Sequence, residues 1–351
     1  MKYTAVDLFC GCGGLSEGMN RAGFDVKAGI DINVEVARAY RMNHPKAVVF
    51  NEDIRSFDVT RLRRVTGDQP LHLLAGCPPC QGFSSVRRLN KRNVIRDERN
   101  QLILDYLRFV NELRPLTIMM ENVPRLAEYY LFTEMVRELR KLGYDIEFKS
   151  VDVKDYGIPQ RRRRLVLAGS LLGHLAIQEP TGERLTVRDA IGGLESTEVT
   201  NDALHKITIK HSRRIRNLIA LIPKDGGSRK DLPRRYILEC HLKQAVGFGD
   251  IYGRLRWDDC SGTITGGCLN PSKGRFLHPE EDRVITPREA LLLQSFPLDY
   301  KLPLDVGKAS LAAMIGEALP PKFSYIQCKA IKRHLDKHLC RTSSQKRNEA
   351  T

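Results

Sequence analysis

The sequence predicts an α/β protein: a doubly wound, Rossmann-like sheet with a smaller, loop-rich domain. Short apolar strands alternate with helical patterns through the first half of the chain, which is typical of such sheets. A glycine-rich turn follows the first of these strands. From about residue 172 to 275 the chain becomes rich in Gly, Arg and Lys and lacks helix periodicity, which indicates the second domain.

Residues 4–9 are short and apolar, which predicts the first strand. Gly11, Gly13 and Gly14 predict a tight turn, and residues 15–22 predict a helix that ends at Gly23. Glycine lets a ligand approach the backbone, and a helix N-terminus attracts a negative group. A nicotinamide-dependent enzyme would begin similarly, but the spacing here is not G-x-G-x-x-G.

The same alternation continues. We expect a helix at 34–42 and strands at 26–30, 47–50, 71–75, 116–120 and 165–169. Acidic residues follow three of these strands, namely Asp31, Asp53 and Glu121. In doubly wound sheets the ligand lies outside the carboxyl ends of the strands, and an acid after the second strand holds ribose hydroxyls. Asp31 occupies that position.

The chain is basic. It has 351 residues, enough for one large and one smaller domain, and a net charge of +15. The excess charge favours a polyanionic partner, although a basic surface that only aids solubility is the alternative. No apolar run approaches the roughly 20 residues that span a bilayer, and the N-terminus lacks a signal-peptide core. We therefore expect a cytoplasmic protein.

Nine cysteines in a chain of this length do not indicate a disulfide framework. Cys77 and Cys80 have the C-x-x-C spacing of redox or zinc sites, but no second pair completes a zinc site. His334, His338 and Cys340 fit the solvated face of a basic helix better than a metal site. We expect no structural metal.

The segment 76–84, GCPPCQGFS, directly follows the fourth strand. Two prolines fix the backbone ahead of Cys80, and the polar stretch 85–99 carries several arginines. This pattern suggests a nucleophile beside a phosphate-contacting lid. A structural cysteine in a turn is the other interpretation, and these residues alone do not separate the two.

Motifs spread over residues 4 to about 325 resemble those of the prokaryotic C5 cytosine-specific DNA methyltransferases. In chain order they are D-L-F-x-G-x-G-G from residue 7, G-x-P-P-C-Q-G-F-S from 76, E-N-V from 121, Q-R-R-R-R from 160, T-P-R-E-A-L from 286, Q-S-F-P from 294 and G-E-A-L-P-P from 316. The resemblance implies a Rossmann-like methyltransferase sheet and an S-adenosylmethionine-dependent enzyme that flips a cytosine out of duplex DNA.

The resemblance also implies the catalytic residues. Cys80 would add to C6 of the base, and a protonated Glu121 would face N3. Arg164 would hold O2, while Arg162 supports the site. Arg161 and Arg163 fall off the family pattern and are expected to face solvent or phosphate.

The implied cofactor and DNA contacts form two further sets. The cofactor residues are Phe9, Gly11, Cys12, Gly14, Asp31, Ile32, Asp53, Ile54, Pro79 and Leu102. The DNA contacts are Ser84, Arg87 and Arg99, of which Arg99 would hold backbone phosphate. We expect residues 1–171 and 276–340 to form the catalytic domain, 172–275 the target-recognition domain and 341–351 a polar tail.

One residue departs from the family. Glu317 stands where the family has asparagine near the cofactor, which puts cofactor affinity and rate in doubt. A DNA-binding protein without activity is therefore one alternative, opposed by intact Cys80, Glu121 and Arg164. The tRNA-directed branch is another, opposed by the absence of its Cys-Phe-Thr signature. We expect a monomer associated with the nucleoid, either solitary or paired with a restriction endonuclease.

Overall fold

The computed structural model describes residues 2–67, 69–79, 101–237 and 250–348, with side chains to residue 340. They form two compact units. The first comprises Met1–Asp152, Arg163–Pro180 and Leu319–Thr351, and the second comprises Val153–Arg162 and Thr181–Ala318. We expected residues 276–318 beside the catalytic sheet, but they pack within the second unit. Residues 153–162 also belong to the second unit. The assignment of functional domains stays a prediction.

The first unit contains a seven-stranded sheet in the order β3-β2-β1-β4-β5-β7-β6. Its strands are β1 (Thr4–Leu8), β2 (Asp25–Ile30), β3 (Val48–Phe50), β4 (Leu73–Gly76), β5 (Thr117–Asn122), β6 (Asp145–Asp152) and β7 (Arg163–Ser170). Strands β1 to β5 pair in parallel, whereas β7 is antiparallel to both β5 and β6. The predicted α/β class is confirmed, while β6 and the antiparallel end of the sheet were not predicted.

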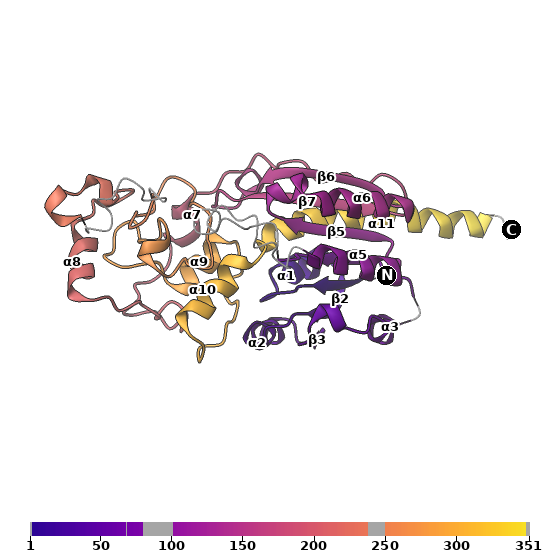
Figure 1. Cartoon of the computed structure of the whole chain (residues 1–351), viewed down its shortest axis with the longest axis horizontal. Coiled ribbons are helices and arrows are strands. Elements are labelled where there is room, and N and C mark those ends of the chain that lie inside the picture. The colour runs from indigo at the N-terminus through magenta and orange to yellow at the C-terminus, as the bar shows by residue number, and fades with distance from the viewer. Residues whose placement is uncertain (1, 68, 80–100, 238–249, 349–351) are drawn as a thin grey trace. The chain divides into compact units, whose positions relative to one another are not determined.

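Helices cover both faces of this sheet (Figure 1). They are α1 (Gly14–Ala22), α2 (Val34–Asn43), α3 (Thr60–Thr66), α5 (Leu102–Leu113), α6 (Tyr130–Lys141) and α11 (Pro321–Asn348). The predicted helices correspond to α1 and α2 within one residue at either end. Helix α11 extends to residue 348, so it includes most of the segment that we expected to be a tail.

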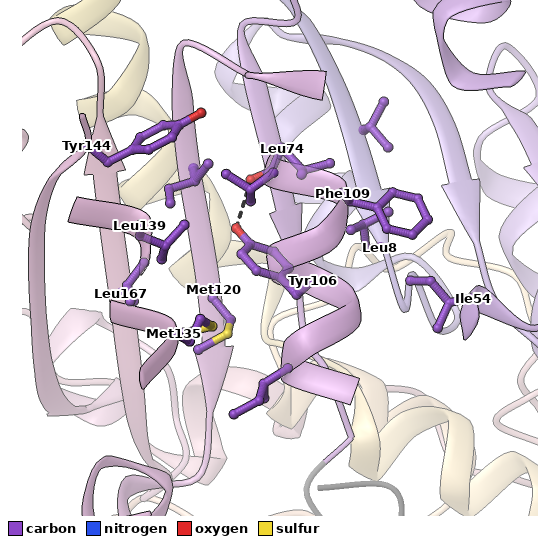
Figure 2. Packing of buried hydrophobic residues seen from close by; sticks show 14 of the residues in the cluster. Leu8, Ile54, Leu74, Tyr106, Phe109, Met120, Met135, Leu139, Tyr144 and Leu167 are labelled. Carbon is purple, nitrogen blue, oxygen red and sulfur yellow. Dashed lines mark hydrogen bonds between the residues drawn. The ribbon is translucent and has the colours of Figure 1, made fainter. Parts of the chain in front are cut away.

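Side chains alternate between the two faces of the strands. Val6 and Leu8 of β1 belong to a large apolar cluster with α3, α5 and α6, whereas Asp7 faces α1. Figure 2 shows the centre of this cluster, where the buried Tyr106 of α5 lies beside β4. Its hydroxyl lies 3.2 Å from Leu74 O and 3.1 Å from Met119 O, so one polar atom meets carbonyls of two adjacent strands.

The second unit is rich in loops, as predicted. Its helices are α7 (Val187–Ile191), α8 (Arg213–Leu221), α9 (Pro287–Leu293) and α10 (Lys308–Glu317). The fully buried Arg254 organises part of it by donating to the carbonyls of Ile219, Ile222, His278 and Glu281 and by pairing with Asp282. A single guanidinium thus supplies hydrogen bonds to backbone carbonyls that do not belong to a strand ladder.

No helix in the described part of the chain is both long and apolar enough to cross a membrane.

The close approach of α1 and α11 depends on Gly18. A Cβ at this position would lie 2.3 Å from Ser324 Cβ and 2.5 Å from the backbone nitrogen of Tyr325. We expect Gly18→Ala to lower the free energy of unfolding by about 1–3 kcal/mol, because α11 must shift to admit the methyl group. Urea denaturation measures this. Gly193→Ala is the control, since a Cβ there meets no described atom within 4 Å; equal losses in both variants would contradict the prediction.

Candidate active site

Several predicted site residues that the structure describes follow strands of the first unit at one edge of the sheet. Leu8, Ile30 and Gly76 are level with one another across β1, β2 and β4, and Gly76 is level with Met120 of β5. The residues that follow these strand ends therefore emerge side by side, at the edge where doubly wound sheets bind ligands.

The turn after β1 has an unusual backbone. Phe9, Gly11 and Gly13 all have positive φ, at 57°, 56° and 100°. For phenylalanine this conformation is strained, so the surrounding structure must enforce it. The turn leaves open space beside Gly11, where an added Cβ would meet no described atom within 4 Å. Cys12 is buried, and Gly14 begins α1.

Two side chains hold this turn. Asp31 Oδ2 accepts a hydrogen bond from Gly11 N at 3.0 Å, and its Oδ1 accepts one from Asn33 N at 2.9 Å. Burial raises the pKa of Asp31, while the two N–H groups oppose that shift. On the other side of the turn, the buried His44 donates from Nε2 to Gly13 O at 3.2 Å. Burial lowers the pKa of His44 to about 4, so it is a neutral donor near pH 7.

The residues expected along the ribose and the adenine differ in exposure. Ile32, expected at the ribose, is 65% exposed, whereas Ile54, expected at the adenine, lies in the apolar cluster. The carboxylate of Asp53 pairs with Arg55 at 2.6 Å, which lowers the pKa of Asp53. Leu102 is partly buried against the same cluster.

The proline loop after β4 is fixed from β5. Asn122 is buried and donates from Nδ2 to Pro78 O at 2.9 Å, while its Oδ1 accepts from Val123 N. This hydrogen bond holds the backbone directly before the partly buried Pro79. Cys80, Ser84, Arg87 and Arg99 lie outside the described residues.

Glu121 and Arg164 lie together at the same end of β5 and β7. Glu121 is opposite Val166, and Arg164 is two residues from Val166, so both side chains project from one face. Arg164 Nε lies 2.6 Å from Glu121 Oε1, and the two side chains are only 15% and 9% exposed. The pair brings a carboxylate and a guanidinium to the strand end that also fixes the proline loop.

Arg162 belongs to the second unit and has a different environment. It is buried and donates from Nη1 to Ile264 O at 3.0 Å and to Gly316 O at 2.9 Å. The buried Gln160 donates to Gln294 Oε1 and accepts from Ile264 N, which ties the same loop to α9. The off-pattern residues Arg161 and Arg163 are exposed, as expected.

Gly316 allows α10 to lie close to the loop that contains Ile264 and Thr265. A Cβ on Gly316 would lie 1.9 Å from the carbonyl carbon of Thr265, so only glycine fits. Glu317 follows at the end of α10 and is exposed. Within the described ranges, no three His, Cys, Asp or Glu side chains gather as metal ligands would. His334 instead contacts Ser170 Oγ at 2.8 Å.

Sequence reasoning missed the supporting roles of Asn122 and His44. Asn122 stands inside the E-N-V motif, so the sequence drew attention to it. Its hydrogen bond to Pro78 O depends on the pairing of β4 with β5, which the motif does not reveal. His44 stands just beyond α2 with no motif around it, and only the fold brings its ring to Gly13.

The two neighbouring arginines allow a matched test. We expect Arg162→Met to lower the free energy of unfolding by about 2–4 kcal/mol, because two carbonyls lose a charged donor in the interior. Arg161→Met should stay within about 0.5 kcal/mol, since Arg161 is exposed and lies 3.7 Å from Asp259. Chemical denaturation of both variants measures the difference. An unchanged free energy of unfolding in Arg162→Met would show that the Arg162 guanidinium is not needed for stability.

Known proteins resemble this chain over nearly its whole length. A type II methylase of Herpetosiphon aurantiacus, M.HgiDII, is 35% identical over 349 residues, covering 96% of this chain and 97% of that protein. A type II methyltransferase of Haemophilus parahaemolyticus, M1.HphI, is 31% identical, with 94% and 87% covered.

Solved structures share the fold. A prophage-encoded methyltransferase from E. coli has a TM-score of 0.73 at 24% identity, covering 95% of this chain and 100% of that one. A methyltransferase from Entamoeba histolytica has a TM-score of 0.63 at 18% identity, covering 97% and 99%. The family model described as C-5 cytosine-specific DNA methylase matches residues 3–333. With nearly the whole chain matched, the protein belongs to the C-5 cytosine-specific DNA methylase family.

Proposed function

We propose that this protein is a sequence-specific DNA (cytosine-5)-methyltransferase that uses S-adenosylmethionine and acts on duplex DNA. The observation that carries the proposal is the buried Glu121–Arg164 pair, at the strand end where Asn122 fixes the loop leading to Cys80. A carboxyl group, a planar five-donor cation and a cysteine are the groups that covalent activation of a cytosine ring requires.

The turn after β1 fits the proposed cofactor. Each carboxylate oxygen of Asp31 has a lone pair left after its one backbone hydrogen bond, so it can also accept from ribose hydroxyls. The open space beside Gly11 admits a ligand close to the backbone. The proposed contacts are Phe9, Gly11, Cys12, Gly14, Asp31, Ile32, Asp53, Ile54, Pro79 and Leu102. When bound, S-adenosylmethionine supplies an electrophilic methyl group.

In the proposed reaction the Cys80 thiolate adds to C6 of the flipped cytosine. The electron pair of the 5,6 double bond then becomes available at C5, which takes the methyl group. Loss of the C5 proton to a base restores the double bond, and the thiolate leaves. Flipping costs a few kcal/mol, which DNA contacts must offset.

Glu121 and Arg164 are proposed to exchange partners when the base arrives. Arg164 donates to O2, while Glu121 in its protonated form donates to N3 as negative charge develops on the ring. Both side chains are mostly shielded from water, so these contacts act in a low-dielectric setting where they are strong. Arg162 is proposed to support the site through Ile264 and Gly316 rather than by touching the base.

DNA binding is proposed to rest on charge and on the second unit. The net charge of +15 favours duplex phosphate, with Ser84, Arg87 and Arg99 as contacts. Residues 172–275 are proposed to read bases in the major groove. We propose a monomer acting in the cytoplasm at the nucleoid, with a partner endonuclease possible but not needed for methyl transfer.

Methyl transfer to nucleic acid separates the proposal from the tRNA-directed alternative. We expect purified protein to incorporate labelled methyl groups into mixed-sequence duplex DNA and not into tRNA. Scintillation counting of both substrates measures this, with bisulfite sequencing to locate the methylated cytosines. Incorporation into tRNA alone would refute the proposed substrate.

Covalent trapping separates an active enzyme from a DNA-binding protein without activity. We expect a stable adduct on 5-fluorocytosine DNA that contains the recognition site, because fluorine at C5 cannot leave as a proton. Cys80→Ser should bind the DNA but form no adduct and transfer no methyl group. Cys77→Ser, three residues earlier, is the matched control and should still form the adduct. Methyl transfer by Cys80→Ser would contradict the assignment of the nucleophile.

A further inference from the structure

Beneath the turn after β1 lies a carboxyl group that the proposed mechanism does not use. Asp7 of β1 is fully buried, and its Oδ2 accepts a hydrogen bond from Ser16 Oγ at 2.6 Å. Its Oδ1 has no hydrogen-bond partner among the described residues, although it is fully shielded from solvent. Burying an unpartnered carboxylate oxygen is costly, so a functional explanation is called for.

The surroundings of Asp7 are built to hold it. Ser16 Oγ also lies 2.6 Å from the hydroxyl of Tyr40, which forms a chain from Tyr40 through Ser16 to Asp7. Gly29, opposite Asp7 on β2, makes room for this chain. A Cβ at Gly29 would lie 2.8 Å from Tyr40 Cζ and 3.0 Å from Cys10 Sγ.

Among the residues that the structure describes, the titratable groups that face Asp7 supply no positive charge. They are Asp31 after β2, Cys10 in the turn, Tyr40 of α2 and Cys328 of α11. Burial raises the pKa of Asp7 to about 7, and the nearby Asp31 carboxylate adds to that rise. The described part of the chain therefore has a site of negative potential next to the turn, and none of the groups found to face Asp7 there is a cation.

We propose that Asp7 is a positioning residue that ionises in response to a positive charge bound at the turn, and thereby favours the sulfonium methyl donor over its neutral thioether product. This inference rests on the proposed use of S-adenosylmethionine. On binding of the cation, Asp7 releases its proton to the solvent; once the methyl group has left, the ligand sulfur is neutral and Asp7 takes a proton back. Ser16 and Tyr40 keep Oδ2 hydrogen bonded in both states.

Calorimetry with three ligands tests this role by binding rather than by activity. S-adenosylmethionine and sinefungin carry a cation at the position of the sulfur, whereas S-adenosylhomocysteine does not. Titration at pH 7 in buffers of different ionisation enthalpy gives the protons released. We expect release of about half a proton with S-adenosylmethionine and sinefungin, because a group with a pKa of about 7 is half protonated at pH 7. S-adenosylhomocysteine, whose sulfur is neutral, should release much less.

Asp7→Asn removes the ionisable group with little change in shape. This variant should bind S-adenosylhomocysteine within about twofold of the wild-type affinity but lose about tenfold in its preference for S-adenosylmethionine at pH 8. Its proton release should not depend on the ligand. Asp25→Asn is the control, because Asp25 lies at the other end of β2 paired with Lys27, and it should behave as wild type.

Stability gives a second measurement that does not depend on ligand. Since the folded pKa of Asp7 lies above its value of 3.8 in the unfolded chain, folded protein binds more protons between about pH 4 and 7 and loses stability as pH rises through that range. Asp7→Asn should therefore melt at a higher temperature than wild type at pH 8, with the difference shrinking toward pH 5.

The outcomes are distinguishable. Equal proton release by wild type with all three ligands, or a ligand-dependent release that survives in Asp7→Asn, would overturn the role of Asp7 and leave the proposed function intact. Failure of wild type to bind any of the three ligands would refute the proposed cofactor itself.

Discussion

The hydrogen bond from Gly11 N to the Asp31 carboxylate is the contact on which the proposed cofactor site depends. It joins the turn after β1 to the end of β2, which are level in the sheet but 20 residues apart in sequence. Because Phe9 on one side of it adopts a positive φ, the turn needs such a cross-link to hold its shape. His44 at Gly13 completes the restraint with a neutral ring, which adds no charge near the carboxylates.

The parallel half of the sheet was predictable because its strands are short apolar runs bounded by glycine or acidic residues. Asp31 and Glu121 were predicted as site residues partly for the same reason, since they stand where strands end. Strand β6 was missed because this edge strand has no continuous apolar run: its sequence is DIEFKSVD, and only Ile146 and Val151 are buried. Helices α3, α5 and α6 were also not predicted, although α5 and α6 supply much of the apolar cluster. Of α11, only a basic helix near the C-terminus was predicted.

Two residues that are close together in a motif can have different surroundings in the fold. Arg162 and Arg164 are two residues apart, yet Arg164 pairs with Glu121 in the first unit and Arg162 holds carbonyls of the second. The change occurs where β7 begins at Arg163. Sequence reasoning assigned Arg162 a supporting role from family pattern, but the partners it supports, Ile264 and Gly316, lie more than a hundred residues away.

The packing of α1 against α11 has a consequence for biosynthesis. Ser324 Oγ donates to Leu15 O across 309 residues, and Tyr3 reaches Asp336 across 333. At about 5–20 residues per second, a ribosome needs roughly 15–60 s to make the chain between these contacts. Helix α1 emerges with its apolar side uncovered and waits for its partner throughout that interval. The turn at its N-terminus therefore gains its final support late, so nascent chains have a long period in which chaperones or aggregation compete for the exposed face.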